Sequence, residues 1–546
     1  MRLAFIQCFR YKYLSGLASK QHNLFLELEP KRGAIYDTRL RPLALNIPTD
    51  SVYAVPVDIK DKEGFAKEVS SLMQIDKDSL RQKINQKKQF VWILRKLDKE
   101  KSAELKRYKI KGIGFIRESK RSYPNHYLAS HVIGFAGIDN IGLEGLELSY
   151  DRFLKGSPGL SLILRDARQR GILLGEEILP SRDGANIVLN IDSVIQFIAE
   201  RHLDEACSRY HPQAASIVVL DPKTGKILAL ANRPTYDLND FKDSAQESRR
   251  NRAITDMFEP GSVFKIVTAS CAIENNKVKE EDKIFCENGT YKVANHILHD
   301  HTPHGWLTFR DVIRQSSNIG TTKVAQILGP QLLYNYVRGF GFGSRLGVDL
   351  IGEIPGSIKA PSFWSKTSIG AVPIGQEVGV TALQLASAIS VIANQGRLMR
   401  PFLVDSVLDN NNEVIKKFEP KVLRQVISEK TALRVKEILV AVIEGGTGKL
   451  AKIDGVRAAG KTGTAQKLEP NGAYSHAKFI GSFIGFAPAD DPVIAVAIVI
   501  DEPMPVYYGG VVAAPVFKDV AGEVLRYLGI KPKEESKLNE IARISQ

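Results

Sequence analysis

The stretch EPGSVFKIV, at positions 259–267, places Ser262 three residues before Lys265. A serine hydroxyl is a poor nucleophile until a positioned base takes its proton, and a lysine amine can be that base. Positions i and i+3 of a helix share a face, so a helix that begins after the Pro-Gly break would bring the two side chains together. Its N-terminal N–H groups would also face developing negative charge. A serine at this position is equally an ordinary helix cap, and the motif alone leaves both interpretations open.

A second Ser-x-x-Lys, SHAK, provides an internal comparison. Ser475 and Lys478 lie between an Asn-Gly turn and the strand-like run FIGSFIGF. Because residues three apart in a strand point to opposite faces, this pair is predicted not to act as nucleophile and base. The comparison favours Ser262.

The stretch QSSNIGTTKVA places Ser316 and Asn318 at the opening of another segment of helical periodicity. Both are common capping residues, and that interpretation remains open. In the catalytic interpretation, Ser316 relays a proton between Lys265 and the leaving group, while the Asn318 amide holds the substrate backbone.

The third motif is AAGKTGTAQK, with Lys461, Thr462, Gly463 and Thr464. We predict a strand in which the small Gly463 lets a ligand approach the backbone. Lys461 and the threonine hydroxyls could receive a substrate carboxylate through charge-assisted contacts. A similar stretch, DPKTGK at 221–226, is predicted to be a turn between two short strands.

The two motif lysines are expected to work together. The reference pKa of lysine is about 10.4, and lowering it by roughly three units corresponds to about 4 kcal/mol. Burial and a second nearby cation both lower the pKa of a lysine. We therefore expect Lys461 to lie beside a buried Lys265.

A metal or cofactor site is the alternative to serine chemistry in this chain. A polar stretch offers metal-capable side chains at Cys286, His296, His299, Asp300, His301 and His304. Their spacing matches no standard zinc site, so a polar loop near the cleft is predicted, with no metal. The glycines of GFGFGSRLG lack the strand, helix and acidic partner of a dinucleotide site, and no cofactor is predicted.

These motifs fall in the second of two predicted regions. Residues 29–180 alternate strand-like pieces with charged helices, as in an α+β accessory domain. Within it, 82–112 has basic and apolar residues at helical spacing, typical of a solvated amphipathic segment. A strand, a helix capped by Asp192 and a hairpin then open the region 181–530, and 531–546 is predicted to be a frayed charged tail.

Composition narrows the class of protein. With 546 residues, 44% hydrophobic and 25% charged, the chain is expected to fold into two or three domains. The net charge of +14 suits an anionic partner such as nucleic acid, a membrane surface or a cell-wall polymer. No nucleic-acid recognition motif accompanies the charge. No apolar run reaches the roughly 20 residues that span a bilayer.

Ser-x-x-Lys, Ser-x-Asn and Lys-Thr-Gly, in this order, form the signature of penicillin-binding proteins and serine β-lactamases. Here the three are SVFK, SSN and KTGT. In addition, RGAIYD and GIDNIGLEGLE resemble the pedestal of the class B penicillin-binding proteins, which are monofunctional peptidoglycan D,D-transpeptidases. FEPGSVFK, GQEVGVTALQLASAISVIANQG and YYGGVVAAPVFKDV resemble the division and sporulation branch, of FtsI or SpoVD type. The resemblance extends over nearly the whole chain.

The resemblance implies an α/β (α+β) fold of two parts. An α+β pedestal, similar to a dimerisation domain, would precede a transpeptidase domain of the serine β-lactamase-like fold, with a mainly antiparallel sheet flanked by helices and an all-helical subdomain. Ser262 would attack the penultimate D-alanine of a stem peptide, with Lys265 as base and Ser316 as proton shuttle. The roles of the remaining residues would be substrate holding for Asn318, carboxylate binding for Lys461, Thr462 and Thr464, and an oxyanion hole of the Ser262 and Thr464 backbone N–H groups.

The chain departs from the family pattern in two places. The pedestal motif usually continues Asp-Arg-x-Gly, whereas YDTRLRPLA keeps Asp37 but has Thr38 and no glycine, which puts the local turn in question. The family also has about 20 apolar residues upstream of the matched N-terminal segment. We expect 1–28 to be the remnant of a membrane-anchor helix and its juxtamembrane segment, in a single-pass inner-membrane protein that faces the periplasm.

The resemblance also defines the expected partners and the alternatives. The expected ligands are stem peptides, lipid-linked nascent glycan and β-lactams, and the expected partners are a polytopic glycosyltransferase and other division proteins. A β-lactamase or β-lactam sensor is the second enzyme hypothesis, disfavoured by the pedestal. A catalytically silent division scaffold is the third hypothesis, and binding to nucleic acid rests on charge alone.

Overall fold

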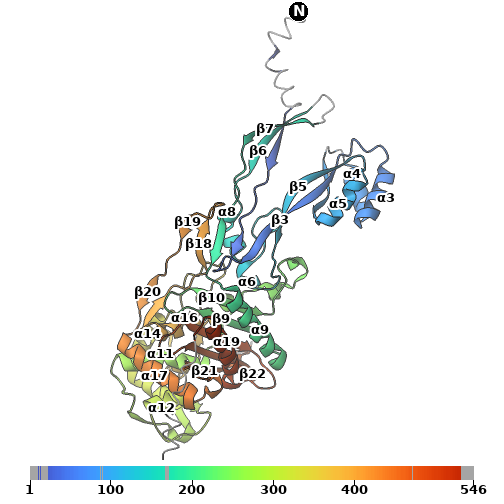
Figure 1. Cartoon of the computed structure of the whole chain (residues 1–546). Helices are drawn as coiled ribbons and strands as arrows, with labels where there is room; N and C mark the ends of the chain where they lie inside the picture. Colours follow the sequence, from blue (N-terminus) through green and yellow to red (C-terminus); the bar gives the residue numbers. More distant parts are fainter. Residues whose placement is uncertain are drawn as a thin grey trace, which may run out of the picture.

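The computed structural model describes residues 10, 11, 13, 23–86, 88, 90–165, 171–469 and 471–530. The predicted anchor remnant, 1–28, lies mostly outside these residues, and the predicted tail, 531–546, lies entirely outside them. Within the described chain, no helix has the length and apolar character needed to cross a bilayer. The molecule is elongated, with the N-terminal sheets at one end and a larger α/β unit at the other (Figure 1).

The N-terminal part is built on two sheets. A three-stranded antiparallel sheet contains β1 (Asn23–Leu28), β6 (Gly159–Arg165) and β7 (Gly171–Leu179). A seven-stranded sheet, in the order β19-β18-β8-β2-β3-β4 with β5 also paired to β3, contains β2 (Ile35–Tyr36), β3 (Pro42–Ala54), β4 (Val91–Leu97), β5 (Ile113–Ser122), β8 (Asn186–Leu189), β18 (Val404–Leu408) and β19 (Val414–Lys417). Strands from both sides of residue 180 therefore share one sheet.

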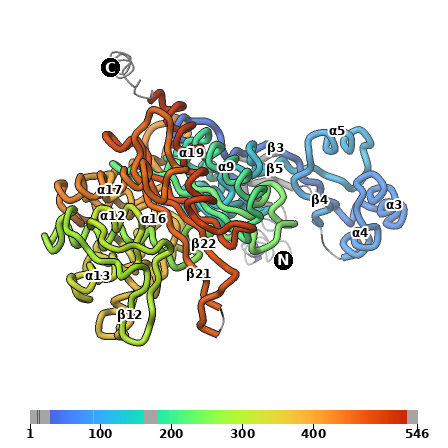
Figure 2. Tube along the Cα trace, turned by 90° about the horizontal axis from the view of Figure 1, so that it is seen from below, coloured from blue at the N-terminus to red at the C-terminus, as the bar shows by residue number. Residues whose placement is uncertain are grey.

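The segment between β3 and β5 forms a small lobe. Its helices are α3 (Lys62–Met73), α4 (Lys77–Ile84) and α5 (Lys99–Arg107), and it projects to one side of the molecule (Figures 1 and 2). The prediction of helical spacing throughout 82–112 is wrong, because β4 lies between α4 and α5. Ile93 and Leu97 of this strand are buried in the lobe core, and the period of two fits a strand with one face inward.

The two pedestal motifs meet in a buried ion pair. Arg32, from RGAIYD, donates through Nε to Glu147, from GIDNIGLEGLE, at 2.6 Å. Arg121 donates to the other oxygen of the same carboxylate, also at 2.6 Å. All three side chains are almost fully buried, and Asp151, which accepts from Arg32 at 2.6 Å, supplies the second carboxylate that balances the two arginines. Short helices complete this region: α6 (Ser130–Ile133), α7 (Gly145–Ser149) and α8 (Asp151–Leu154).

The unusual turn after Asp37 is well defined. One Asp37 oxygen accepts the N–H groups of Arg39 and Arg41, each at 2.9 Å, and the other accepts the Arg41 guanidinium at 2.7 Å. Leu40 adopts φ +59°, the left-handed conformation that a glycine would adopt more readily. The turn therefore forms without the usual glycine, and Leu40 adopts the strained conformation in its place.

A five-stranded antiparallel sheet forms the centre of the larger unit, in the order β10-β9-β23-β22-β21. Its strands are β9 (Ala214–Leu220), β10 (Ile227–Arg233), β21 (Ala459–Leu468), β22 (Tyr474–Ala487) and β23 (Ile494–Asp501). The predicted hairpin is β9–β10, and the predicted strand with Lys461 is β21, at one edge of the sheet. The prediction of an antiparallel sheet is confirmed.

Helices cover both faces of this sheet. On one face lie α9 (Ser193–Tyr210) and α19 (Ala514–Tyr527), which bury alternate residues of β9 such as Ile217 and Val219. The predicted Asp192 cap is confirmed, because its carboxylate accepts the N–H of Val194. On the other face lie α11 (Lys265–Glu274) and α16 (Ala382–Ala393).

A helical subdomain lies beyond α11, beside the β21 edge. Its helices are α12 (Phe309–Arg314), α13 (Asn318–Leu328), α14 (Pro330–Gly339), α15 (Ser368–Ala371) and α17 (Glu429–Gly445). Short helices elsewhere are α10 (Arg252–Thr255) and α18 (Gly509–Val512). Small two-stranded ladders pair β11 (Lys283–Phe285) with β14 (Trp306–Thr308), β12 (Thr290–Val293) with β13 (His296–His299), β15 (Ser357–Ile358) with β16 (Val378–Gly379), and β17 (Arg397–Met399) with β20 (Val422–Gln425).

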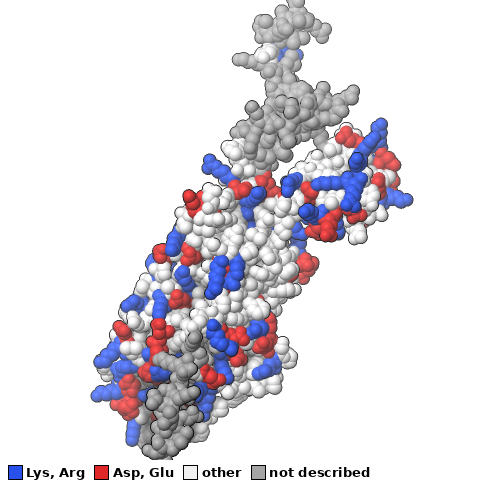
Figure 3. All heavy atoms as spheres, in the orientation of Figure 1, with Lys and Arg blue, Asp and Glu red and all other residues white. Residues whose placement is uncertain are grey.

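Charge is mixed on the surface. Lys and Arg side chains alternate with Asp and Glu over the face in Figure 3, including the side lobe. Among the described residues many charges are paired, as in Lys106 with Asp50 and Lys77 with Glu63.

Candidate active site

Ser262 lies in a tight turn at the junction of sheet and helical subdomain. The turn is a short 3₁₀ helix, Gly261–Phe264, which leads directly into α11 at Lys265. Residues three apart are eclipsed in a 3₁₀ helix, so Ser262 and Lys265 share a side of the turn, as predicted from their spacing. The 3₁₀ geometry differs from the expected α-helical start. No hydrogen bond joins the hydroxyl to the amine in this structure.

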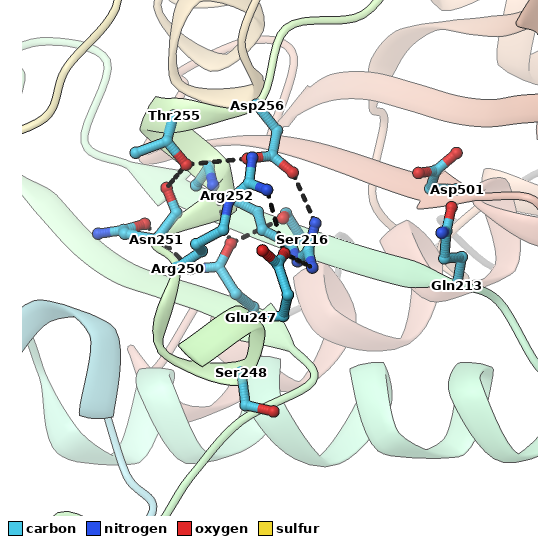
Figure 4. A network of polar contacts seen from close by, with 12 residues as sticks. Gln213, Ser216, Glu247, Ser248, Arg250, Asn251, Arg252, Thr255, Asp256 and Asp501 are labelled. Atoms are coloured by element: carbon cyan, nitrogen blue, oxygen red, sulfur yellow. Dashed lines mark hydrogen bonds and ion pairs between the residues drawn. The ribbon is translucent and has the colours of Figure 1, made fainter. Parts of the chain in front are cut away.

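The segment before the turn is held by an ion-pair network (Figure 4). Asp256 accepts from Arg250 and Arg252, both at 2.7 Å. Glu247 accepts from the same two arginines, at 3.0 and 3.3 Å. These ion pairs therefore fix the segment that leads into the serine turn, Gly261–Phe264.

Glycines allow the serine turn to lie against β21. A Cβ on Gly463 would approach Val263 Cγ1 within 2.8 Å and the Pro260 carbonyl oxygen within 2.9 Å. Gly261 has φ +60°, and a Cβ there would lie 2.7 Å from the Thr464 carbonyl oxygen. The expectation that Gly463 leaves room for a ligand is therefore wrong at this face of the strand, since the serine turn fills the space.

Lys265 is completely buried and hydrogen bonded. Its Nζ donates to the Ser316 carbonyl oxygen at 2.6 Å, to the Ser316 Oγ at 3.2 Å and to the Asn318 Oδ1 at 2.8 Å. Burial lowers the pKa of Lys265 to about 7, although the negative charge of Asp300 and, to a smaller extent, the Cys286 thiol act in the opposite direction. Burial thus favours the neutral amine, which is the form that can accept a proton.

Lys461 completes a bridge through Ser316. Its buried Nζ donates to the Ser316 Oγ at 2.9 Å, so one hydroxyl touches the amines of Lys265 and Lys461. Burial and the charge of Lys265 lower the pKa of Lys461 well below its usual value. The expected pairing of two lysines is present in the geometry, and mutual repulsion disfavours two ammonium groups in this site.

Ser316 itself is a strained residue. Its φ of +61° is left-handed, a conformation that costs a non-glycine residue about 1–2 kcal/mol. Helix capping does not explain it, because the residue that caps α13 is Ser317, whose Oγ accepts the Gly320 N–H at 2.9 Å. Strain of this kind is common at functional sites.

Asn318, Thr462 and Thr464 line the same region. The Asn318 amide accepts from Lys265 through Oδ1 and donates to the His299 carbonyl oxygen at 2.9 Å through Nδ2, which leaves one N–H for another acceptor. On β21, the Thr462 hydroxyl contacts that of Thr447 at 2.8 Å, and the Thr464 hydroxyl accepts the Gly509 N–H at 3.0 Å.

The second Ser-x-x-Lys, SHAK, and the second Lys-Thr-Gly, DPKTGK, have ordinary structural roles, and we call them the decoy motifs. In SHAK, the Ser475 Oγ accepts the Lys478 backbone N–H at 3.1 Å, while the Lys478 ammonium pairs with Glu469. In DPKTGK, Asp221 accepts from the Lys223 N–H and from the Thr224 hydroxyl in the turn between β9 and β10. Neither motif lies in the lysine-serine network.

The polar stretch 286–304 is organised differently from a metal site. Within the described residues, no group of three or more His, Cys, Asp or Glu side chains is placed to hold a metal ion. Cys286 is a buried free thiol, and His296 and His299 lie on β13, so part of the predicted loop is a strand. His301 stacks on Tyr508 with ring centroids 4.9 Å apart.

Sequence reasoning missed several contacts of the site. Asp300 was noted only as a possible metal ligand, although it binds the segment that carries Asn318. Its position close before QSSN was the available signal. Thr447 and Gly509 come from distant parts of the chain, and no motif marks either residue.

The geometry as a whole places one hydroxyl between two buried amines, beside a second serine and an edge strand. Such an arrangement can move a proton away from Ser262 without a charged imidazole or a metal. It can also bind a carboxylate at Lys461 and the β21 hydroxyls, where charge-assisted hydrogen bonds are strong. This is the chemistry of acyl transfer through a serine ester.

Comparison with known proteins yields two family models. The model described as penicillin binding protein transpeptidase domain matches residues 215–522. The model described as penicillin-binding protein dimerisation domain matches residues 27–189.

Relatives match over most of their length. Stage V sporulation protein D of Bacillus subtilis is 35% identical, over 98% of this chain and 84% of its own. Peptidoglycan D,D-transpeptidase FtsI of Escherichia coli is 33% identical, over 93% of this chain and 85% of its own. The crystal structure of penicillin binding protein 3 from Mycobacterium tuberculosis, complexed with aztreonam, is 28% identical with a TM-score of 0.73, and the match covers 93% of this chain and 99% of that chain.

Proposed function

Since this chain belongs to the class B penicillin-binding proteins of the FtsI/SpoVD type, we propose that it is a serine D,D-transpeptidase that cross-links peptidoglycan stem peptides in septal wall synthesis. The observation that carries the mechanism is the bridge from Lys265 through Ser316 to Lys461, with Ser262 three residues before Lys265 in the serine turn. The names of two relatives, a peptidoglycan D,D-transpeptidase and a sporulation protein, support the substrate and the cellular role.

Acylation begins at Ser262. Its Oγ attacks the carbonyl carbon of the penultimate D-alanine as its proton passes to the neutral amine of Lys265. The C–N bond to the terminal D-alanine then breaks, and Ser316 relays a proton from Lys265 to the departing amine. The product is an ester on Ser262 and free D-alanine.

The edge strand β21 is proposed to bind the substrate. Lys461, Thr462 and Thr464 would receive the terminal carboxylate, which favours the protonated form of Lys461 and thereby the neutral form of Lys265. The N–H groups of Ser262 and Thr464 would stabilise the oxyanion, a contribution of about 3 kcal/mol. Asn318 would hold the peptide backbone with its free amide N–H.

Transfer completes the cycle. An amine of a neighbouring stem peptide attacks the ester carbon, the C–O bond to Ser262 breaks, and the proton from the amine returns to the serine through Lys265. The new amide bond is the cross-link. β-Lactams would acylate Ser262 in the same way and remain attached.

Turnover of a synthetic D-Ala-D-Ala peptide in the presence of an acceptor amine tests this function. The wild type should release D-alanine and form the amide product, Ser262→Ala should do neither, and Ser475→Ala should behave as the wild type. Hydrolysis of bound penicillin within seconds would instead indicate a β-lactamase. A folded wild type that releases no D-alanine and is not acylated would support the scaffold hypothesis and overturn the proposal.

We further propose that the protein is anchored in the inner membrane with its catalytic domain in the periplasm. Its proposed partners are a polytopic glycosyltransferase that supplies nascent glycan and other division proteins. Membership of the family that includes FtsI and stage V sporulation protein D supports this arrangement. Protease digestion of intact and permeabilised spheroplasts tests the location: cleavage in intact spheroplasts is expected, and protection until permeabilisation would contradict it.

A further inference from the structure

The Asp300 carboxylate contacts the segment Ser316–Asn318 directly and takes no part in the reaction steps described above. We infer that Asp300 is a positioning residue of the proposed transpeptidase, whose carboxylate holds the segment of Ser316 and Asn318 in place and whose negative charge acts on the buried Lys265. This inference rests on the proposed function, since it concerns the same site.

Three hydrogen bonds fix the position of Asp300. Its Oδ1 accepts the backbone N–H groups of Asn318, at 2.6 Å, and Ile319, at 3.0 Å. Its Oδ2 accepts the Ser317 hydroxyl at 2.6 Å. These donors belong to the first residues of α13 and its cap, where backbone N–H groups have no partner inside the helix.

The strain at Ser316 explains why such a clamp is needed. Ser316 holds φ +61° between the end of α12 and the start of α13. A left-handed serine persists only where its surroundings fix it. Asp300 fixes the residues that immediately follow, and Lys265 fixes Ser316 from the other side by donating to its carbonyl oxygen. Together they aim the Ser316 hydroxyl at both amines.

Charge is the second part of the role. The groups that act on Lys265 are the carbonyl and hydroxyl oxygens of Ser316, the Asn318 amide, the Asp300 carboxylate after β13 and the Cys286 thiol before β12, with Lys461 on the other side of the Ser316 hydroxyl. Asp300 provides the carboxylate of this set. Its charge raises the pKa of Lys265, opposing the decrease caused by burial. The carboxylate thus keeps Lys265 from losing its proton too readily to serve as a donor to Ser316.

The substitution Asp300→Asn separates the two parts. Asparagine keeps an oxygen for the two backbone N–H groups, and its amide can donate to the Ser317 hydroxyl, which can accept it beside Gly320. The charge is lost but the clamp remains. Asp300→Ala removes both. Asp311→Asn is a matched control, because this carboxylate lies in the neighbouring helix α12 and binds Arg314 and Thr308 instead.

The experiment measures the second-order rate of acylation by a fluorescent penicillin from pH 5 to 9. The rate rises with pH as Lys265 becomes neutral. Because loss of the Asp300 charge lowers the pKa of Lys265, the acidic limb of Asp300→Asn should move to lower pH by roughly one unit, with a plateau within about two-fold of the wild type. Asp300→Ala should show the same shift and a plateau at least about ten-fold lower. Asp311→Asn should overlay the wild type.

The outcomes separate this inference from the proposed function. An Asp300→Asn profile that overlays the wild type, or an Asp300→Ala plateau equal to it, would overturn the inference while leaving the transpeptidase proposal intact. A wild type that is not acylated, or a label that survives Ser262→Ala, would overturn the proposed function itself.

Discussion

Lys265 shows how a buried position prepares a base. In the unfolded chain the amine has a pKa of about 10.4, and in the folded protein burial lowers it to about 7. Between these values the unfolded chain binds a proton that the native state does not, so the free energy of unfolding rises with pH in this window. Holding the Lys265 amine in its neutral form therefore lowers the free energy of unfolding at neutral pH.

This linkage gives a prediction for Lys265→Met. The variant has no titrating group at position 265, so its free energy of unfolding relative to the wild type should fall by about 4 kcal/mol between pH 7 and pH 10. Urea unfolding at several pH values measures the difference, with Lys478→Met, at the decoy motif, as the matched control. A difference for Lys265→Met that is constant over this range would contradict the burial argument.

The adjacent serines Ser316 and Ser317 allow a second test. Ser316→Ala removes the hydroxyl that joins the two lysines, and the rate of acylation should fall by about 10²-fold or more with little change in stability. Ser317→Ala removes a helix cap, and the free energy of unfolding should fall by about 1 kcal/mol with a smaller loss of rate. Penicillin labelling and urea unfolding measure the two effects. The reverse pattern would exclude Ser316 as the relay.

At the scale of elements, the site depends on the close contact between the serine turn and β21. Gly463→Ala would place a methyl group against the Pro260 carbonyl oxygen and Val263, which we expect to lower the free energy of unfolding by about 1–3 kcal/mol and to slow acylation.

Gly522→Ala provides the comparison for this substitution. Gly522 lies within α19, and a Cβ there would meet only Ile453, at 3.8 Å. This variant should be more stable than the wild type by about 0.5–1 kcal/mol. Equal effects of the two substitutions in thermal and urea unfolding would show that Gly463 is not needed for close packing.

The sequence motifs predicted some elements better than others. Ser262 with Lys265, and Lys461 on a strand, could be predicted because each signal is local and the decoys had visibly different surroundings. The strand β4 was predicted as part of a helical segment because the charged helices α4 and α5, on either side of it, dominate the pattern of 82–112. The filling of space at Gly463 and the three hydrogen bonds of Asp300 depend on segments that are distant in the sequence, and no periodicity indicates either.

At the scale of the whole molecule, the N-terminal part and the catalytic part share structure. The strands β8 and β18 pair with each other, and β8 pairs in parallel with β2, so a sheet joins residues 35–36, 186–189 and 404–408. The domain boundaries, 29–180 and 181–530, are a prediction from the sequence. Shared backbone hydrogen bonds indicate that the catalytic unit is held rigidly on the pedestal.

The buried pair of Arg32 and Glu147 tests the pedestal. Arg32→Ala would remove one of the two arginines that pair with the buried Glu147 carboxylate. We expect the free energy of unfolding to fall by about 3–5 kcal/mol. Thermal unfolding of the purified variant measures this. Arg39→Ala, which removes a largely exposed arginine paired to Asp192, should have a much smaller effect. A comparable loss in both variants would argue against a special role for the buried pair.

The central claim is that Ser262 is the residue acylated by penicillin. Purified protein would be treated with a fluorescent penicillin, digested and examined by mass spectrometry, with Ser262→Ala and Ser475→Ala in parallel. We predict a long-lived adduct on the peptide that contains Ser262 in the wild type and in Ser475→Ala, and no adduct in a folded Ser262→Ala. An adduct on any other serine, or no adduct on folded wild type, would contradict the account.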